Sequence, residues 1–415
     1  MPAEATALLP AGTGSFSLEA YLDRGGYATA RRVLGTMTPE AVLTEVKKAD
    51  LRGRGGAGFP AGLKWSFVPP PDGRPRYLCV NADEGEPGTF KDRAVMTRNP
   101  HLLLEGIIIA SYAVDVHQSF IYIRGEYEAL ARRLEGAIDE ARGKGFLGRA
   151  LFGSSFDLDV VVHRGAGAYV CGEETALLES LEGKRGEPRL KPPFPASVGL
   201  FGRPTVINNV ETIACVPRIL ERGAAWFLEQ GVGKDGGRRL YGVSGCVRRP
   251  GLYELPVGTT LRSIVYDHAG GPAEGQSVKA VIPGGLSAPL LTAAEIDVTM
   301  DCDSLSCAGS MLGSAGIIVV GDKTSMLDVL KVVSRFYAHE SCGQCTPCRV
   351  GTNWIDKIVS RLVERGGGPG DLDLVRELAL GMKGRTLCPL GDAAAQPVVA
   401  IVDKFRDELE RRIAG

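Results

Sequence analysis

This sequence has neither a large excess of charge of one sign nor a long apolar run. Its 48 Lys and Arg residues balance 49 Asp and Glu residues, which leaves a formal net charge of -1 at pH 7. Without a basic excess to neutralise phosphates, nucleic acid is not expected as a main partner. The longest apolar run, residues 102–114, is interrupted by Glu105 and Gly106 and is shorter than a membrane span. We therefore expect no membrane insertion, and any membrane association to be through partner proteins.

Targeting signals and a disulfide framework are missing as well. The N-terminal residues from Met1 to Glu4 show neither a basic segment followed by an apolar core nor an Arg-rich transit pattern. Ten cysteines in 415 residues are too few for a disulfide-stabilised secreted protein. We therefore expect a cytoplasmic protein, with enough length for two to four domains that each have a core.

What the sequence does contain is a distinctive spacing of cysteines. Cys342, Cys345 and Cys348 form a triplet, and Cys388 follows forty residues later, next to Pro389. A triplet with one remote cysteine suits a cubane iron–sulfur cluster, because the triplet binds one side and a distant loop binds the other. A structural zinc site usually has two separated Cys-x-x-Cys pairs, so zinc is the main alternative and a disulfide the lesser one. An iron–sulfur cluster would make this a protein that handles single electrons.

The first half of the chain alternates between expected strands and helices. Strands are predicted at 77–80, 120–124 and 157–162, and helices at 39–49, 100–113, 126–142 and 172–181. This alternation predicts a parallel sheet with helices on both faces. Ligands of such sheets lie at the carboxyl ends of the strands, so the loops after Val80 and Val162 are the expected site.

The pattern changes twice further along the chain. Short strands at 240–244, 251–255 and 278–282, with one helix at 261–269, indicate a small α+β module. Helical periodicity then returns at 326–339, 349–364, 371–382 and 393–413, which indicates a four-helix bundle that carries the cysteines. We therefore predict three domains, at 1–235, 236–322 and 323–415.

Glycine is abundant, with 55 residues, and it is clustered. Residues 53–58 match G-x-G-x-x-G, but a helix precedes them where a dinucleotide fingerprint needs a strand. Backbone amides in this loop, together with Arg54 and Lys64, are suited to holding phosphate, and Phe59 and Phe67 to stacking on a planar base. The alternative is a tight turn with Arg and Lys on the surface.

A second loop combines glycine with charge directly after the strand at 77–80. Its polar residues alternate with Gly85 and Gly88 and are Asn81, Asp83, Glu84 and Glu86. The glycines let the chain pass close to a flat ring. An amide or carboxylate there can then hydrogen-bond the ring nitrogens of a flavin.

A third glycine loop, residues 165–172, leads into a helix with Glu173 and Glu174 in its first turn. Acidic residues are favoured there by the helix dipole, so capping is one explanation. The functional alternative is that one carboxylate accepts hydrogen bonds from a ribose diol. A carboxylate in that position would also repel a 2′-phosphate, which would favour NADH over NADPH.

Together these motifs closely resemble the NADH-binding, flavin-carrying subunit of respiratory complex I (NADH:quinone oxidoreductase), a module also found in NAD-linked hydrogenases and formate dehydrogenases. The resemblance runs from about residue 30 to 410 and is carried by segments 51–60, 81–93, 163–177, 189–195, 208–212, 340–349 and 388–392. It implies a Rossmann-like α/β domain, a ubiquitin-like (β-grasp) middle domain and a cluster-bearing helical bundle. It also implies FMN, NADH and a [4Fe-4S] cluster.

The resemblance assigns residues to each ligand. Cysteines 342, 345, 348 and 388 are the cluster ligands. The implied FMN-binding residues are Gly53, Arg54, Gly55, Gly56, Gly58, Lys64, Asn81, Asp83, Asn208, Asn209 and Thr212. The adenine is expected near Phe59, Phe67 and Phe194, a phosphate near Lys191, and the ribose near Glu174. Glu84, Tyr169, Gly172 and Glu173 complete the cofactor-binding set. Glu86, near the nicotinamide end, is the predicted catalytic residue.

The implied function is hydride transfer from NADH to FMN, followed by single-electron transfer to the cluster and onward. The implied partners are a small thioredoxin-like [2Fe-2S] subunit and a large multi-cluster subunit, on the inner face of the cell membrane. The sequence shows neither the N-terminal thioredoxin-like domain nor the ferredoxin extension frequent in the relatives, which favours complex I. Two alternatives remain: a diaphorase subunit of a hydrogenase or formate dehydrogenase, and a non-catalytic zinc scaffold that binds a nucleotide. Val350 and Pro389 depart from the family pattern, but neither removes a ligand.

Overall fold

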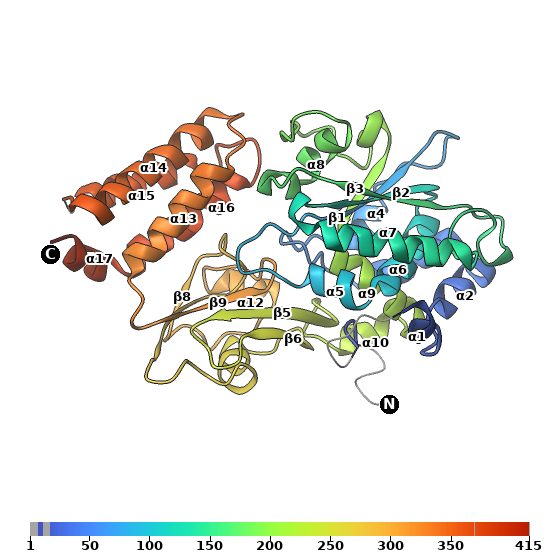
Figure 1. Ribbon diagram of the computed structural model, residues 1–415, viewed down its shortest axis with the longest axis horizontal. Coiled ribbons are helices and arrows are strands. Elements are labelled where there is room, and N and C mark those ends of the chain that lie inside the picture. Colours follow the sequence, from blue (N-terminus) through green and yellow to red (C-terminus); the bar gives the residue numbers. More distant parts are fainter. Residues whose placement is uncertain (1–6, 11–16, 369, 415) are drawn as a thin grey trace.

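The computed structural model describes residues 7–10, 17–368 and 370–414 and shows a mixed α/β fold (Figure 1). A parallel sheet with its helices, a second sheet of mixed direction and a group of helices follow one another along the chain. In Figure 1 the C-terminal helices lie to the left of the parallel sheet, and the second sheet lies below. None of the described helices has the length and apolar character of a membrane span.

The parallel sheet has the strand order β3-β2-β1-β4. Its strands are β1 (Tyr77–Ala82), β2 (Gln118–Ile123), β3 (Asp159–Arg164) and β4 (Thr205–Asn209). Every neighbouring pair runs parallel, with Leu78 opposite both Ser119 and Val206. The predicted parallel sheet is therefore confirmed, although the sequence analysis missed β4. Because all four carboxyl ends meet at one edge, the loops that follow them are neighbours.

Helices cover both faces of this sheet, as predicted. Leu78 and Val80 belong to one hydrophobic core, which includes residues of α6 (Pro100–Ala113) and α9 (Val210–Arg222). Cys79, which points to the opposite face, belongs to a second core with residues of α8 (Glu174–Leu181) and of the C-terminal helices. The remaining helices of this part are α1 (Leu18–Leu22), α2 (Ala28–Thr36), α3 (Pro39–Lys48), α4 (Ala61–Trp65), α5 (Asp92–Arg98), α7 (Glu128–Gly143) and α10 (Ala224–Glu229).

Helix α6 is buried on almost all sides, which explains its nearly continuous apolar sequence. It crosses α9 at Gly106, where a Cβ atom would collide with the carbonyl oxygen of Ile213. Its neighbour α9 starts directly after β4, and the Asn209 side chain caps it by accepting a hydrogen bond from the amide of Glu211. The carboxyl end of β4 is thereby fixed to the helix that follows it.

The middle part of the chain forms a five-stranded sheet of order β6-β5-β9-β7-β8. Its strands are β5 (Arg238–Gly245), β6 (Gly251–Pro256), β7 (Val278–Ile282), β8 (Leu291–Thr292) and β9 (Gly316–Gly321). The predicted helix at 261–269 is a short helix, α11 (Leu261–Ser263), continued by a π-helical turn over Ile264–His268. A further short helix, α12 (Cys302–Cys307), precedes β9. These elements enclose a core of their own.

The C-terminal helices are α13 (Met326–Glu340), α14 (Thr346–Arg365), α15 (Gly370–Met382), α16 (Leu390–Lys404) and α17 (Arg406–Ala414). The single helix predicted over 393–413 is wrong, because the chain turns at Phe405 and forms two helices. The turn lets the Glu408 carboxylate accept a hydrogen bond from the amide of Met326 and pair with Lys279 of β7. Local periodicity does not report such long-range contacts.

Candidate functional site

The glycine loop at 53–58 is fastened to the start of α9. Gly53 and Phe59 close the loop through an amide-to-carbonyl hydrogen bond of 3.1 Å, and the amide of Arg54 donates to Thr212 Oγ1 at 2.8 Å. A Cβ atom at Gly55 would lie 3.1 Å from Cβ of Asn209, so glycine allows this close approach. The predicted residues Gly53, Gly55, Asn209 and Thr212 therefore lie together.

The side chain of Arg54 does not face solvent in this loop. Its guanidinium is fully buried, donates to the carbonyl oxygen of Gly236 at 2.9 Å and lies 3.5 Å from the Asp235 carboxylate. Of the two cations predicted to hold phosphate, only Lys64 keeps its side chain partly exposed, at 26%. The Arg54 side chain instead anchors the loop to the middle part of the chain.

Lys64, Glu173, Glu174 and Lys191 form an outer ion-pair group beside this loop. Lys64 Nζ lies 2.7 Å from Glu174, and Lys191 Nζ lies 2.9 Å from Glu173 and 3.2 Å from Glu174. Burial alone would raise the pKa of Glu174, but the two ammonium groups outweigh it and hold that pKa below its usual value. Glu173 also caps α8 by accepting from the amides of Thr175 and Ala176, so the capping explanation is correct for Glu173.

The asparagines at the sheet edge are held by their neighbours. Asn81 Nδ2 donates to the carbonyl oxygen of Gly172 at 2.8 Å, which joins the end of β1 to the segment before α8. Asn208 Oδ1 accepts from Trp65 Nε1 at 2.8 Å. The structure thus brings together residues that are 91 and 143 positions apart in the sequence, as the predicted site requires.

Asp83 carries an unsatisfied acceptor at this edge. Its Oδ2 atom is buried and has no hydrogen-bond partner within the described part of the chain. Burial raises the pKa of Asp83 to about 7, although Arg124 opposes the shift. A buried acceptor without a partner is the kind of group that a ligand N–H or hydroxyl satisfies. Together with the close-packed glycine loop, it fits the ring and side chain of a flavin.

The two glutamates of the second loop have different partners. The Glu84 carboxylate accepts hydrogen bonds from the amides of Asp92 and Arg93, at 2.7 and 3.1 Å, and so caps α5. The Glu86 carboxylate accepts from the hydroxyl of Tyr169 and from the amide of Ser287, both at 2.7 Å. Burial raises the pKa of Glu86. Glu86 thus lies between the parallel-sheet part and the middle part of the chain.

The three predicted stacking rings are exposed. Phe59, Phe67 and Phe194 have exposed fractions of 46%, 53% and 59%, and the centroids of Phe59 and Phe67 are 6.1 Å apart. Apolar rings that lie together on the surface can mark a ligand-binding groove. They remain suited to stacking on an adenine.

A buried charge group, which the sequence analysis did not find, lies under the glycine loop. Its members are Arg54, Lys91, Asp92, Glu211, Asp235 and Arg239, all less than 9% exposed. Lys91 Nζ lies 2.8 Å from Asp92, 2.9 Å from Glu211 and 3.1 Å from Asn209 Oδ1. Asn209 Nδ2 in turn donates to Asp92 at 2.6 Å. The charges within segment 81–93 were a signal for this group, but the contribution of Glu211 depends on the fold.

Three of the four predicted cluster cysteines lie at helix N-termini. Cys345 directly precedes α14, Cys348 is buried in its first turn, and Cys388 comes two residues before α16. Cys342 lies between α13 and α14, and its carbonyl oxygen accepts from Arg185 at 2.8 Å. All four pack in the second core. Helix N-termini favour thiolates, so this donor set fits an anionic iron–sulfur cluster. No three His, Cys, Asp or Glu side chains among the described residues are grouped as around a single metal ion.

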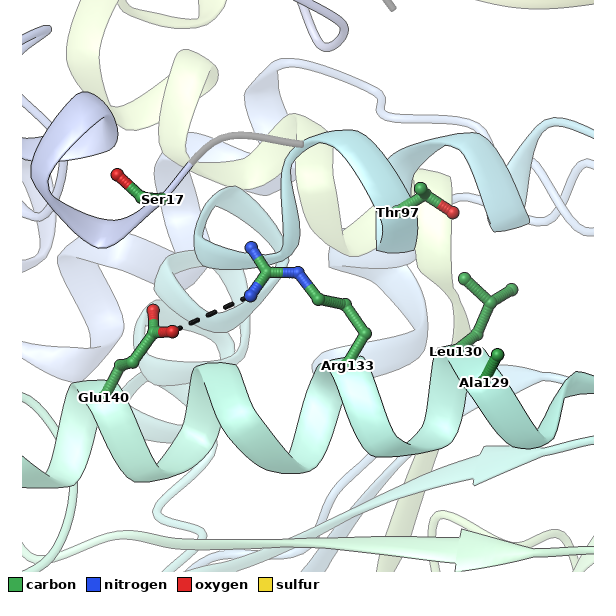
Figure 2. A pocket seen from close by; sticks show the side chains of 6 residues that line it. All are labelled: Ser17, Thr97, Ala129, Leu130, Arg133 and Glu140. Atoms are coloured by element: carbon green, nitrogen blue, oxygen red, sulfur yellow. Dashed lines mark ion pairs between the residues drawn. The ribbon is translucent and has the colours of Figure 1, made fainter. Parts of the chain in front are cut away.

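A hollow in the described part of the chain lies away from this site. Figure 2 shows this concavity of about 500 Å³, which is lined by Ser17, Thr97, Ala129, Leu130, Arg133 and Glu140. Arg133 and Glu140 form an ion pair of 3.7 Å within it. None of the predicted site residues lines it, so the candidate site is defined by the loops at the sheet edge.

Three family models match successive parts of the chain. Residues 46–218 match the family model of the Nuo51 FMN-binding domain, 239–330 the SLBB domain, and 328–412 the NADH-ubiquinone oxidoreductase-F iron-sulfur binding region. The chain is 55% identical to the F 2 subunit of the NADH-quinone oxidoreductase of Rhizobium meliloti (strain 1021), over 95% of this chain and 94% of that one. It is 51% identical to the F subunit of the NADH-quinone oxidoreductase of Mycobacterium tuberculosis (strain ATCC 25618 / H37Rv), over 94% and 88%.

A solved structure is similar over nearly the whole chain. The match is to a crystal structure of an NAD+-reducing [NiFe]-hydrogenase in the H2-reduced state, with a TM-score of 0.85 and 37% identity. It covers 97% of this chain and 67% of the hydrogenase chain.

Proposed function

Because the chain belongs to the family of NADH-quinone oxidoreductase F subunits, we propose that it oxidises NADH with bound FMN and passes electrons singly through a [4Fe-4S] cluster to partner subunits. FMN supplies the conversion from a two-electron hydride donor to one-electron acceptors, and the cubane supplies such an acceptor. The protein supplies position and electrostatics. The matches to FMN-binding and iron–sulfur models weigh against the zinc-scaffold alternative.

One contact carries this proposal: the amide of Tyr169 donates to the Glu340 carboxylate at 3.1 Å. Tyr169 opens the 3₁₀ turn Tyr169–Gly172, and Gly172 accepts from Asn81 of the proposed flavin site. Glu340 ends α13, two residues before Cys342. The same short turn therefore contacts both the flavin residues and the cysteine-bearing segment, which suits direct electron transfer between them.

We assign the following roles to the residues of the site. The backbone of Gly53–Gly58 with Lys64 holds the FMN phosphate, while Asn81, Asp83, Asn208 and Asn209 orient the ring and its side chain. Phe59, Phe67 and Phe194 offer surfaces for the adenine, and Lys191 pairs with a phosphate of NADH. Glu174 accepts from the adenosine ribose, and Glu86 contacts the nicotinamide end. Glu84 and the guanidinium of Arg54 do not contact the cofactors and instead hold the binding loops in place. Hydride transfer needs no side-chain base, so these residues contribute by excluding water and fixing geometry.

The domain boundaries and the partner subunits are part of the same proposal. We assign residues 1–235 to a Rossmann-like FMN and NADH domain, 236–322 to a ubiquitin-like (β-grasp) domain and 323–415 to a helical cluster domain. The SLBB match at 239–330 supports the middle assignment. We assign the chain to the peripheral arm of a respiratory complex on the inner face of the membrane, next to a thioredoxin-like [2Fe-2S] subunit and a multi-cluster subunit.

A second candidate is the diaphorase subunit of an NAD-linked hydrogenase, because the solved hydrogenase structure matches 97% of this chain. The chemistry would be the same and only the terminal partner would differ. Higher identity to the relatives from quinone oxidoreductases favours the quinone-linked complex. The subunits that co-purify with the chain distinguish the two candidates by mass and metal content.

The proposal is tested by replacing Cys348 with Ser. NADH should still reduce the flavin rapidly, because the flavin residues are untouched, but electron delivery to the partner subunits should fall to background. Stopped-flow absorbance follows flavin reduction, and EPR follows the cluster. Cys307→Ser, which alters an exposed cysteine at the end of α12, is the matched control and should behave as wild type. Undiminished delivery in Cys348→Ser, or a native protein without flavin and sulfide, would refute the proposal.

A further inference from the structure

The last turn of α13 holds Tyr169 by three side chains. The Glu340 carboxylate accepts from the Tyr169 amide, and the rings of Phe336 and Tyr337 lie 5.1 and 6.3 Å from the Tyr169 ring, edge to face. Glu340 is 20% exposed, and its other oxygen lies 3.2 Å from His339 Nδ1. The position of Tyr169 therefore depends on the helix end that immediately precedes the cysteine triplet.

On its other side, Tyr169 contacts the loop after β1. Its hydroxyl donates to Glu86 at 2.7 Å, and a Cβ atom at Gly85 would lie 3.2 Å from the Tyr169 ring. The second oxygen of Glu86 accepts from the amide of Ser287. Glu86 is thus held by one donor from the middle part of the chain and by one that is tied to α13.

We propose that Glu340 is a positioning residue that couples the cysteine-bearing end of α13 to the nicotinamide end of the nucleotide site, through Tyr169 and Glu86. The inference rests on the proposed function, which places the nicotinamide near Glu86. Glu340 fixes the backbone of Tyr169, the Tyr169 hydroxyl fixes the Glu86 carboxylate, and Glu86 meets the nicotinamide. A disturbance at either end is transmitted because the two hydrogen bonds of Tyr169, one to Glu340 and one to Glu86, join partly or fully buried groups.

Two ligands separate this coupling from a general structural effect. NAD+ reaches Glu86 with its nicotinamide, whereas ADP-ribose lacks that ring and contacts only the adenine, phosphate and ribose residues. The dissociation constants of both are measured on the full chain loaded with FMN and cluster. The loss of one buried hydrogen bond should make the Glu340→Ala variant bind NAD+ about three- to tenfold more weakly. Its affinity for ADP-ribose should not change.

Three further variants sharpen the test. Glu340→Gln keeps a side-chain acceptor for the Tyr169 amide and should restore wild-type NAD+ affinity. Glu364→Ala removes an exposed carboxylate that pairs with Lys331 on the same group of helices, and it should change nothing. In a Tyr169→Phe background the link to Glu86 is already broken, so Glu340→Ala should add little. Should Glu340→Ala fail to fold, Glu340→Asp shortens the carboxylate by one methylene and tests the same contact.

The two dissociation constants decide between coupling and a general structural effect. A selective loss for NAD+ that glutamine restores supports the coupling. Equal losses for NAD+ and ADP-ribose, or no loss, overturn it while leaving the proposed function intact. A wild-type chain that binds neither flavin nor NAD+ overturns the proposed function itself. The EPR spectrum of the cluster gives an independent readout, because Glu340→Ala should shift its signal and Glu364→Ala should not.

Discussion

The outer ion-pair group and the buried charge group consist of the same residue types but differ in their access to water. In the outer group the side chains of Lys64, Glu174 and Lys191 are each about a quarter exposed. In the buried group Lys91 and Glu211 are 2% and 0% exposed. Both groups lie against the loops of the proposed flavin and nucleotide site. Lys64 and Lys191 in the outer group, and Arg54 and Lys91 in the buried group, each lie within 4 Å of a carboxylate.

The difference in exposure indicates that one group of charges serves binding and the other serves structure. Partly exposed ion pairs contribute little to stability, so their partners can be exchanged for a ligand phosphate or hydroxyl at small cost. Buried charges are stabilised by their partners and not by water, so the removal of one leaves an uncompensated charge in the interior. The buried group therefore fixes the shape of the glycine loop, while the outer group remains available for binding.

The largest effect is expected from breaking the buried group. Glu211→Ala leaves Lys91 and Arg54 without a central carboxylate, and the free energy of unfolding should fall by about 3–5 kcal/mol. Glu174→Ala, the matched change in the outer group, should cost less than about 1 kcal/mol. Urea denaturation of both variants measures the two values. Similar losses would show that exposure does not separate the groups.

A smaller effect, on NADH affinity and not on stability, is expected from the outer group. Lys191→Ala removes a cation from the proposed phosphate position, so NADH should bind about tenfold more weakly with little change in stability. The loss should shrink at high salt, because partly exposed charges are screened. Lys184→Ala is the control, since that lysine is 59% exposed and pairs with Glu179 and Glu182. An unchanged NADH affinity in Lys191→Ala would remove Lys191 from the site.

Local patterns predicted much of the fold. The helix at 100–113 and the strand at 278–282 have the predicted bounds, because a long, nearly continuous apolar run and a short β-branched run carry their own signal. Helix α14 begins three residues before its predicted start, at Thr346, and Pro347 fits its first turn because no helical amide is needed there. Strand β4 was missed because its five residues end in two asparagines, which local propensity assigns to a loop.

The candidate site was predictable as a set of residues but not as a set of contacts. The motifs identified Arg54 and Glu84, yet the fold turns the Arg54 guanidinium toward Asp235 and makes Glu84 a helix cap. Glu340 lay within a quoted motif, but its contact with Tyr169 spans 171 residues. No local pattern encodes such a pairing, because it depends on how two distant elements pack.

The smallest effect is expected from Asp83, a carboxyl group at the sheet edge that belongs to neither group. Its pKa is raised to about 7 in the folded chain from an ordinary value of 3.8. Between these values the folded state keeps a proton that the unfolded state has released, so stability falls as pH rises through this window. Asp83→Asn removes the titration, and its melting temperature relative to wild type should therefore be higher at pH 8 than at pH 5.

The flavin-free chain gives the cleanest measurement, because only the protein then surrounds Asp83. Asp72→Asn is the control, since Asp72 is exposed and a hydrogen bond from Arg74 lowers its pKa, which places its window below pH 4. The same temperature difference at both pH values would show that the pKa of Asp83 is not raised. If added FMN weakens the pH dependence of the wild type, a flavin donor satisfies Oδ2, and the oxygen that lacks a partner in the flavin-free chain is part of the binding site.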